Sequence, residues 1–197
     1  GPIVGWVNSR EYDRTHDEQA AQGWCPQIVD TNGDGKITKR WNKFGGPIDP
    51  KLDSEVRYNL YAIIPSPVDN SVWGASEDFP GFIVRIDRGD NPPETCKTEV
   101  YKVPEAGIDP RGIDIDSNGV VWTALAASSH LASFDRSQCK VFNGPKALSG
   151  TQCEAGWKLH VTDGPRFKGT DIPSDFHYFN WVDQHNVSGL GANTPFA

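Results

Sequence analysis

The hydrophobic residues of this chain fall in short runs that alternate with polar residues and end at turn-forming residues. In one run, the alternation places Ile113 and Ile115 on the same face, as a half-buried strand requires. Gly119 then supplies the positive φ of a tight hairpin turn, and Trp122 lies in the strand that returns. The predicted strands of this unit cover residues 112–116, 120–124, 131–135 and 139–142. The pattern predicts a four-stranded antiparallel unit.

The same order of strands occurs earlier in the chain. The predicted strands of this first unit cover residues 61–64, 71–75, 82–87 and 96–101. Trp73 precedes Trp122 by 49 residues and Asp87 precedes Asp135 by 48, which matches the period of roughly 40–50 residues of a propeller blade. We therefore expect two β-propeller blades, with Trp73 and Trp122 packed in the core.

The flanks of the chain carry incomplete copies of this unit. Residues 3–8 align with a third strand, residues 157–161 suit an outer strand, and residues 178–183 begin a further unit. The predicted fold is all-β, a β-propeller segment of four-stranded antiparallel blades, of which about two are complete and two partial. The predicted limits are 1–57 for a partial blade, 58–104 and 105–160 for two blades, and 161–197 for the start of a further blade.

Two complete blades are fewer than a closed propeller needs. Propellers typically have about 4–8 blades, and an open stack would leave strand edges and apolar faces uncovered. The chain also contains no methionine. We therefore expect an internal piece of a longer polypeptide, whose remaining blades are its partners. The best helical pattern, over residues 13–21, is short and polar.

The composition agrees with this fold class and excludes some functions. The chain has 20 glycines, 15 prolines and 7 tryptophans, a mixture that suits many short strands and turns. Its formal net charge is −7 and it has no basic stripe, so we expect no nucleic-acid partner. No apolar run approaches the roughly 18 residues of a membrane helix, so we expect no membrane span.

The four cysteines bear on the compartment. No two of them form a Cys-x-x-Cys pair, so a zinc site is not expected. Four cysteines allow three pairings, and Cys139 and Cys153 are suitably spaced to close a loop between adjacent strands. Disulfides would imply an oxidising compartment, hence a periplasmic or secreted protein, whereas four buried thiols are the alternative. The other two cysteines are Cys25 and Cys96.

The second repeat resembles a known family. Residues 110–123 read Pro-Arg-Gly-Ile-Asp-Ile-Asp-Ser-Asn-Gly-Val-Val-Trp-Thr, which is similar to the Pro-x-Gly-Ile-x-x-Asp-x-x-Gly-x-Val-Trp-Phe-Thr repeat of streptogramin-lyase-like propellers. The resemblance covers residues 61–142 well and the flanks poorly. It extends to large exported bacterial proteins that carry such a propeller. It implies the propeller fold, whereas activity varies widely among propellers.

The resemblance also implies where a catalytic pair would lie. In the lyases, a histidine and a glutamate near the central channel act as acid and base. In this chain no histidine and glutamate match that spacing. His130, where a loop meets a third strand, is the remaining catalytic candidate and also a candidate ligand-binding residue.

A loop ahead of the first repeat has the spacing of calcium ligands. Residues 30–38 read Asp-Thr-Asn-Gly-Asp-Gly-Lys-Ile-Thr and match the first nine positions of a calcium loop. The predicted donors are the side chains of Asp30, Asn32 and Asp34 and the main-chain carbonyl of Lys36. The sequence thus predicts a structural Ca²⁺ ion, with a metal-free turn as the alternative.

The predicted calcium loop departs from the usual pattern at its twelfth position. That position holds Trp41 where a bidentate glutamate is expected. Asp49, Asp53, Glu55 or water would have to complete the ligand set. No pair of flanking helices is evident, so we expect an inserted loop between strands and not an EF-hand.

Arg111 is a further candidate for ligand binding. It precedes the first strand of a blade, a position that commonly borders the central channel of a propeller. There it could bind an anionic group. The alternative is a structural salt bridge with Asp114 or Asp116.

The C-terminal region holds the last candidates. Trp181, Asp183 and His185 bring aromatic and polar groups together, so Trp181 and His185 could line a pocket, with a solvated strand end as the alternative. Asn186 begins an Asn-Val-Ser glycosylation sequon, which matters only in a eukaryotic secretory pathway.

Three functions follow from these features. The first is a non-enzymatic exported propeller that binds a small molecule or a protein at its channel, with calcium stiffening one loop. The second is an enzyme of the lyase type that uses His130. The third is a structural subunit of an extracellular assembly. The lack of a matching catalytic pair favours the first.

Overall fold

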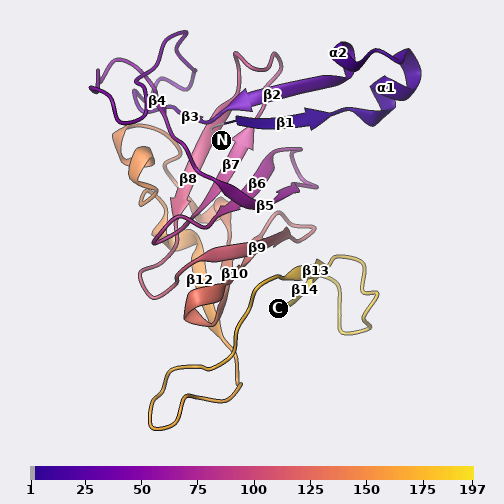
Figure 1. Ribbon diagram of the computed structural model, residues 1–197, viewed down its shortest axis with the longest axis vertical. Coiled ribbons are helices and arrows are strands. Elements are labelled where there is room, and N and C mark those ends of the chain that lie inside the picture. Colours follow the sequence, from indigo (N-terminus) through magenta and orange to yellow (C-terminus); the bar gives the residue numbers. More distant parts are fainter. Residues whose placement is uncertain (1–2) are drawn as a thin grey trace.

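The structure, a computed structural model, describes residues 3–197 (Figure 1). Antiparallel strands form most of its regular structure, with two short α-helices near the N-terminus and short 3₁₀ segments between strands. The predicted all-β class is therefore confirmed. The strands form small separate sheets, and within the described residues these sheets do not close into a ring.

Strands β5–β8 form the first four-stranded sheet, in the order β5-β6-β7-β8. Their bounds are Leu60–Pro65, Val72–Ser76, Phe82–Asp87 and Lys97–Lys102. The turn between β5 and β6 holds Asn70 at a φ of 56°, a left-handed conformation that asparagine tolerates. Trp73 of β6 lies opposite Ile64 and Arg85 on its two neighbours. The register therefore places one alternating set of side chains on each face of the sheet.

Strands β9–β12 form the second four-stranded sheet, in the order β9-β10-β11-β12. Their bounds are Pro110–Ile115, Val121–Leu125, His130–Phe134 and Trp157–Val161. The predicted fourth strand over residues 139–142 is wrong, because β12 takes that place. Phe134 pairs with Trp157, whose ring packs in the core, while Phe142 lies under the Arg136 guanidinium, 4.0 Å from ring centroid to Cζ. Residues 139–142 instead follow the 3₁₀ turn at Arg136–Gln138 and begin the disulfide-closed segment, so residues 157–161 pair with β11 in register from Phe134–Trp157 to His130–Val161.

The two sheets pack face to face around an aromatic core. Trp73 is only 2% exposed, and its ring lies 6.0 Å from that of Tyr101. Tyr101 lies 4.4 Å from Phe134 of the second sheet, and Phe134 lies 4.9 Å from Trp157. These rings and the aliphatic side chains around them form the largest buried cluster. The predicted core position of Trp73 is confirmed.

Trp122 occupies the matching position of the second sheet but is only half buried. Its ring stacks on His160 at 5.1 Å, on the face of the second sheet that points away from the first. Trp73 is covered because a full sheet lies over it, whereas the element that follows the second sheet is the short pair β13–β14. The predicted core position of Trp122 is therefore wrong, because no full sheet covers this side chain.

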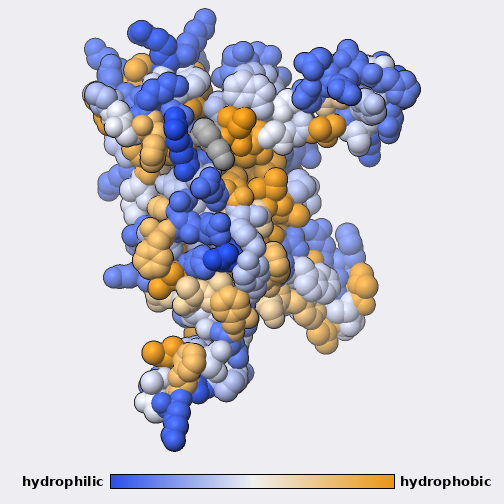
Figure 2. Space-filling view, viewed as in Figure 1, coloured by the Kyte–Doolittle hydropathy of each residue, from blue (hydrophilic) through white to orange (hydrophobic). Residues whose placement is uncertain are grey.

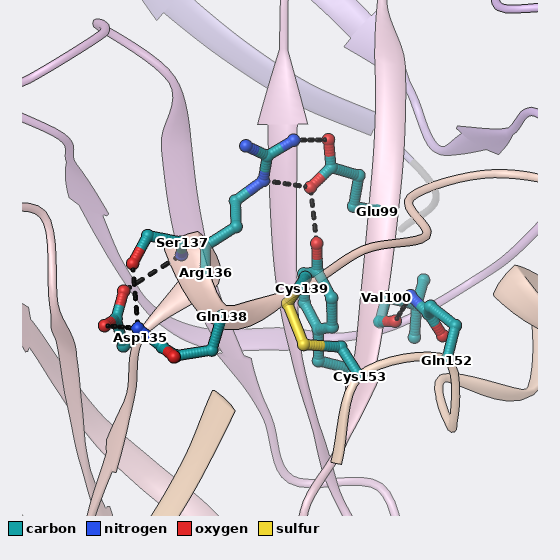
Figure 3. Close-up of a disulfide and its surroundings, with 10 residues drawn as sticks. Glu99, Val100, Asp135, Arg136, Ser137, Gln138, Cys139, Gln152 and Cys153 are labelled. Atoms are coloured by element: carbon teal, nitrogen blue, oxygen red, sulfur yellow. Dashed lines mark hydrogen bonds and ion pairs between the residues drawn. A yellow bond between two sulfur atoms is a disulfide. The ribbon is translucent and has the colours of Figure 1, made fainter. Parts of the chain in front are cut away.

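A disulfide-closed segment covers the free edge of β8. Cys139 and Cys153 are bonded, as are Cys25 and Cys96, and no free cysteine occurs in residues 3–197. Within the closed segment, Gly150 accepts a hydrogen bond from the Lys102 amide at 2.9 Å. The side-chain amide of Gln152 donates to the Val100 carbonyl at 2.8 Å (Figure 3). The segment therefore satisfies backbone groups that an edge strand would otherwise present to another chain.

A buried carboxylate, that of Glu99, joins the two sheets. Arg85 donates to it from β7 at 3.0 Å, and Arg136, which follows β11, donates two bonds of 2.6 and 2.7 Å (Figure 3). The Tyr101 hydroxyl donates a fourth bond at 2.6 Å, and burial raises the pKa of this tyrosine. Asp69 pairs with the other side of Arg85. Burial alone would raise the pKa of Asp69, but hydrogen bonds from Ser71 and Arg85 lower it.

The N-terminal strands form a hairpin against the other face of the first sheet (Figure 1). The elements are β1 (Ile3–Val7), α1 (Ser9–Thr15), α2 (Glu18–Ala21) and β2 (Gln22–Pro26). The predicted helical pattern over residues 13–21 overlaps both helices, which Asn8 and Asp17 cap through their side chains. Trp6 packs beside Val84, and the disulfide Cys25–Cys96 joins the hairpin to the start of β8.

Two further strand pairs complete the structure. β3 (Ile28–Val29) pairs with β4 (Ser54–Glu55), and the chain between them contains the predicted calcium loop. β13 (Trp181–Asp183) pairs with β14 (Thr194–Phe196) beside β9. No helix in residues 3–197 has the length and apolarity to cross a membrane.

We predict that both disulfides stabilise the fold and that the longer closure does more. The cysteines are separated by 14 residues in Cys139–Cys153 and by 71 in Cys25–Cys96. Replacing each pair by serine should lower the free energy of unfolding by about 3 and about 4 kcal/mol respectively, because each bond restricts the unfolded chain. Urea unfolding followed by tryptophan fluorescence measures both values. An unchanged midpoint for either double variant contradicts the prediction.

We predict that Glu99→Gln is strongly destabilising. The change removes the negative charge that Arg85 and Arg136 share, while Arg85 keeps its ion pairs with Asp69 and Asp87, so it should cost about 3 kcal/mol of unfolding free energy. Glu105→Gln is the control, because Glu105 is exposed, and it should change stability by less than about 0.5 kcal/mol. Equal effects of the two substitutions in urea unfolding would refute the role given to Glu99.

Candidate functional site

The predicted calcium loop folds around the carboxylate of Asp30. Asp30 follows β3 and is 5% exposed. One carboxylate oxygen accepts the Gly33 amide at 2.7 Å and the other accepts the Gly35 amide at 2.8 Å. Both glycines have a φ of 81°, which a side chain would strain. The two glycines therefore allow the chain to wrap its amides around one acidic side chain.

Asn32 and Asp34 repeat this arrangement along the loop. The Asn32 side-chain oxygen accepts the Asp34 amide at 2.9 Å, and one Asp34 oxygen accepts the Lys36 amide at 2.8 Å. An oxygen of this type has two lone pairs, so each one bonded to an amide keeps capacity for a cation. The structure thus brings the predicted side-chain donors into a single tight turn.

Asp53 is the downstream carboxylate that reaches this loop. One of its oxygens accepts the Thr38 amide at 2.6 Å, and the other is buried without a hydrogen-bond partner. The Asp53 side chain is fully buried, with 0% exposed. Asp49 is exposed and caps a turn of its own, and Glu55 is bound by Lys43 and Arg57. Of the three carboxylates considered from the sequence, only Asp53 bonds the loop.

The loop also docks on the disulfide-closed segment. The Asn143 side chain donates to Asp30 at 3.1 Å, and the Gly144 amide donates to the Asp30 carbonyl at 2.8 Å. A cavity of about 240 Å³ lies between the loop and the Glu99 network, and Asp30, Asn143 and Glu99 contribute to its lining. The loop of residues 30–38 and Asn143 are far apart in sequence, but they line the same cavity.

Arg111 lies in β9 between two carboxylates. Its guanidinium bonds Glu77 and Asp109, each at 3.0 Å. The hydrogen bond with Asp109 is the main reason why the pKa of Arg111 is raised. Arg111 thus forms salt bridges, but the predicted partners Asp114 and Asp116 are wrong. Asp114 lies on the opposite face of the strand and accepts backbone amides there. Asp116 caps the following turn.

The charge of Arg111 is therefore balanced by two acidic side chains. A guanidinium that already pairs with two carboxylates offers little net positive potential to an incoming anion. The overall charge of −7 acts in the same direction. The predicted anion-binding role for this arginine is accordingly not favoured by its surroundings.

Two tyrosines flank Arg111 and form an aromatic surface with it. The guanidinium carbon lies 5.2 Å from the ring centroids of both Tyr61 and Tyr178. The two hydroxyls share a hydrogen bond, which raises the pKa of Tyr61. Phe179 and Phe176 extend the surface beside Tyr178. We call Tyr61, Arg111, Phe176, Tyr178 and Phe179 the aromatic surface.

Apart from Arg111, the residues of the aromatic surface were not predicted from the sequence, although part of the pattern is visible there. In β5 every second residue faces solvent, and two of these residues, Tyr61 and Ile63, are large and apolar, with 39% and 53% of their surface exposed. Figure 2 shows apolar side chains gathered over β5 and β9 on one face of the molecule. Tyr178 lies 67 residues from Arg111, and no local pattern indicates that contact.

His130 begins β11 and has no carboxylate partner among the described residues. Its Nδ1 atom is buried without a hydrogen bond, and burial lowers its pKa. The neighbouring ionisable group is His177, an imidazole whose Nε2 atom is also buried without a partner. The neutral imidazole of His130 thus lacks the acid–base partner that the lyase resemblance implies.

Trp181 and His185, the predicted pocket-lining pair, both have exposed side chains. The Trp181 ring stacks on Phe196 at 4.7 Å, and the His185 side chain is exposed. Asp183 is buried and accepts the amides of His185, Val187 and Ser188. A hydrogen bond from the Ser188 side chain, together with these amides, lowers the pKa of Asp183 to about 2. Asp183 therefore shapes the loop that presents Asn186.

Comparison with known proteins provides no relative: no protein-family model, curated protein or solved structure matches the chain significantly.

We predict that Asp183 orders this loop in a pH-dependent way. Its pKa of about 2 lies below the ordinary value of 3.8, so its stabilising effect is present above about pH 4 and is lost as the pH falls toward 2. Asp183→Asn should speed hydrogen exchange of the Val187 and Ser188 amides at neutral pH and remove the loss between about pH 4 and pH 2. Asp171→Asn is the exposed control and should leave both amides unchanged. Equal exchange in wild type and Asp183→Asn would contradict the assignment.

Proposed function

We propose that this chain is part of an exported, streptogramin-lyase-like β-propeller that binds carbohydrate on the aromatic surface. The observation that carries the proposal is the aromatic surface itself, which draws residues from the first strands of both four-stranded sheets and from the segment before β13. In a propeller, first strands line the central channel, so the surface would lie at the channel.

The repeated sheets support the propeller part of the proposal. Both four-stranded sheets follow chain order and stack face to face, as adjacent blades do. Trp73 and Trp122 lie at matching positions: the Trp73 ring contacts Phe134 of the second sheet, and the Trp122 ring lies on the face of the second sheet that points away from the first. On this reading β1 and β2 are the third and fourth strands of the preceding blade.

β13 and β14 would be the first two strands of the following blade. β13 is tied to β9 by a hydrogen bond of 2.7 Å from the Val182 amide to Asp114. A Cβ atom on Gly112 would lie 2.7 Å from the backbone of Phe179 and Asn180, so the close approach of this segment requires glycine. Gly112 belongs to the Pro-x-Gly-Ile motif of the second repeat, whereas the register places Ala62 at the matching position of the first repeat.

The cysteines support export. Both disulfides are formed and no free cysteine occurs among the described residues. Paired cysteines hint at an oxidising environment. We therefore place the protein in the periplasm or outside the cell.

The chemistry of the aromatic surface favours a neutral polyhydroxylated ligand. Exposed aromatic faces can stack on the C–H face of a sugar ring, as they do on other apolar surfaces. Glu77 and Asp109 flank Arg111 and can accept hydrogen bonds from sugar hydroxyls, to which charged partners bond strongly. Because these carboxylates also balance the arginine, a neutral sugar suits the site better than an anion.

We predict that the protein is retarded in native gels that contain a neutral polysaccharide. The probes are xylan, mixed-linkage β-glucan and mannan, with dextran sulfate as the anionic comparison. Tyr61→Ala and Tyr178→Ala should weaken binding at least tenfold, because each removes a ring of the aromatic surface. Phe44→Ala is the matched control, since Phe44 is an exposed aromatic residue outside that surface.

Each outcome of this experiment decides the proposal. Retardation by a neutral polysaccharide that the two tyrosine variants lose supports it. Retardation by dextran sulfate alone would indicate an anionic ligand and overturn the carbohydrate assignment. Equal retardation of all variants, or none with any probe, would overturn the aromatic surface as the binding site.

A further inference from the structure

We infer that Asp53 completes a calcium site with the loop of residues 30–38, and that this ion holds the loop on the disulfide-closed segment. The donors are the side chains of Asp30, Asn32, Asp34 and Asp53 and the main-chain carbonyl of Lys36. The inference is independent of the proposed carbohydrate binding, because none of these residues belongs to the aromatic surface.

Asp53 carries the inference because it is a buried carboxylate with one oxygen unpartnered. An unbonded charged oxygen in the interior is strongly unfavourable unless a cation or a donor meets it. Its other oxygen is bonded to the amide of Thr38, the ninth residue of the loop. The carboxylate is thereby held at the loop end where a glutamate at the twelfth position would ordinarily bind the ion.

The reciprocal bonds between Thr38 and Asp53 make this placement specific. The Thr38 hydroxyl accepts the Asp53 amide at 3.3 Å, while the Thr38 amide donates to the carboxylate. Asn42 bonds the main chain on both sides of Asp53, including the Asp53 carbonyl at 2.8 Å. Asp53 comes 15 positions after Thr38, and the chain between them folds back so that the carboxylate returns to the loop.

The donor set selects calcium. All donors are oxygens, and an amide and a main-chain carbonyl stand beside carboxylates, which is the mixture that Ca²⁺ accepts. In residues 3–197 no three histidine, cysteine, aspartate or glutamate side chains are gathered as a metal-binding group, and this includes Asp30, Asp34 and Asp53. An ion would therefore have to draw these three carboxylates together, with the neutral oxygens of Asn32 and Lys36 as further ligands.

The site connects parts of the fold that lie far apart in sequence. Asp30 receives the Asn143 side chain, and its carbonyl receives the Gly144 amide, both from the segment closed by Cys139–Cys153. An ion bound to Asp30 would hold in place the carboxylate that accepts the Asn143 hydrogen bond. Calcium should therefore order the loop and keep it seated on this segment.

Terbium provides a direct probe, because Trp41 lies close to the loop in sequence and can transfer excitation energy to a lanthanide in a calcium site. Wild-type protein should show tryptophan-sensitised Tb³⁺ luminescence that Ca²⁺ displaces and that millimolar Mg²⁺ does not. Isothermal titration should give one Ca²⁺ per chain. Asp53→Asn should raise the Ca²⁺ dissociation constant at least tenfold, because it removes a charged ligand.

Asp49→Asn is the matched control, since Asp49 is an exposed aspartate four residues before Asp53. It should change the dissociation constant by less than threefold. Absent binding in wild type, an unchanged constant in Asp53→Asn, or equal weakening in Asp49→Asn would each overturn the inference.

Limited proteolysis separates loss of the ion from loss of the fold. Lys36, Lys39 and Arg40 are exposed in or just after the loop, and trypsin should cut there faster in EDTA than in Ca²⁺. Asp53→Asn should be cut quickly in both, while its circular dichroism and its cleavage elsewhere match those of wild type. If the Asp53→Asn variant does not fold, Asn32→Ala replaces it in the same assay. Calcium-independent cleavage of wild type would overturn the inference.

Discussion

The carboxylate of Glu99 is the interaction on which the arrangement of the two sheets depends. It lies in β8 of the first sheet and accepts bonds from Arg85 in the same sheet and from Arg136, which follows the third strand of the second. A buried carboxylate bound on several sides cannot shift without leaving charges unpaired, so it fixes one relative position of the sheets. The aromatic core of Trp73, Tyr101 and Phe134 supplies the burial around it.

The segment after Arg136 extends the effect of this network. Cys139 follows three residues later and its disulfide closes a segment that bonds the outer edge of β8. The same segment receives the loop of residues 30–38 through Asn143. A calcium ion in that loop would therefore stabilise its contact with the disulfide-closed segment, which the ionic network and the disulfide already hold in place. That role would be structural.

The aromatic surface lies on the first strands, away from this outer edge. Arg111 is held by two carboxylates and two tyrosines, so its orientation is set before any ligand arrives. Preorganised groups lose little entropy on binding. His130 lies outside the aromatic surface and has no carboxylate partner among the described residues.

Local pattern by itself determined most of the strands, the turns at Asn70 and Gly119, and the tight loop that starts at Asp30. Each of these features depends on a period of two or on residues a few positions apart. Tertiary structure alone decided the contacts between distant residues. It chose Trp157–Val161 over residues 139–142 as the fourth strand, because Cys139 is bonded to Cys153 and the chain leaves the sheet there before it returns to pair with β11. It also chose the cysteine pairs, the partners of Arg111 and the approach of Asp53 to Thr38. These choices depend on which side chains share burial across the folded chain, and alternation along a strand carries no information about that.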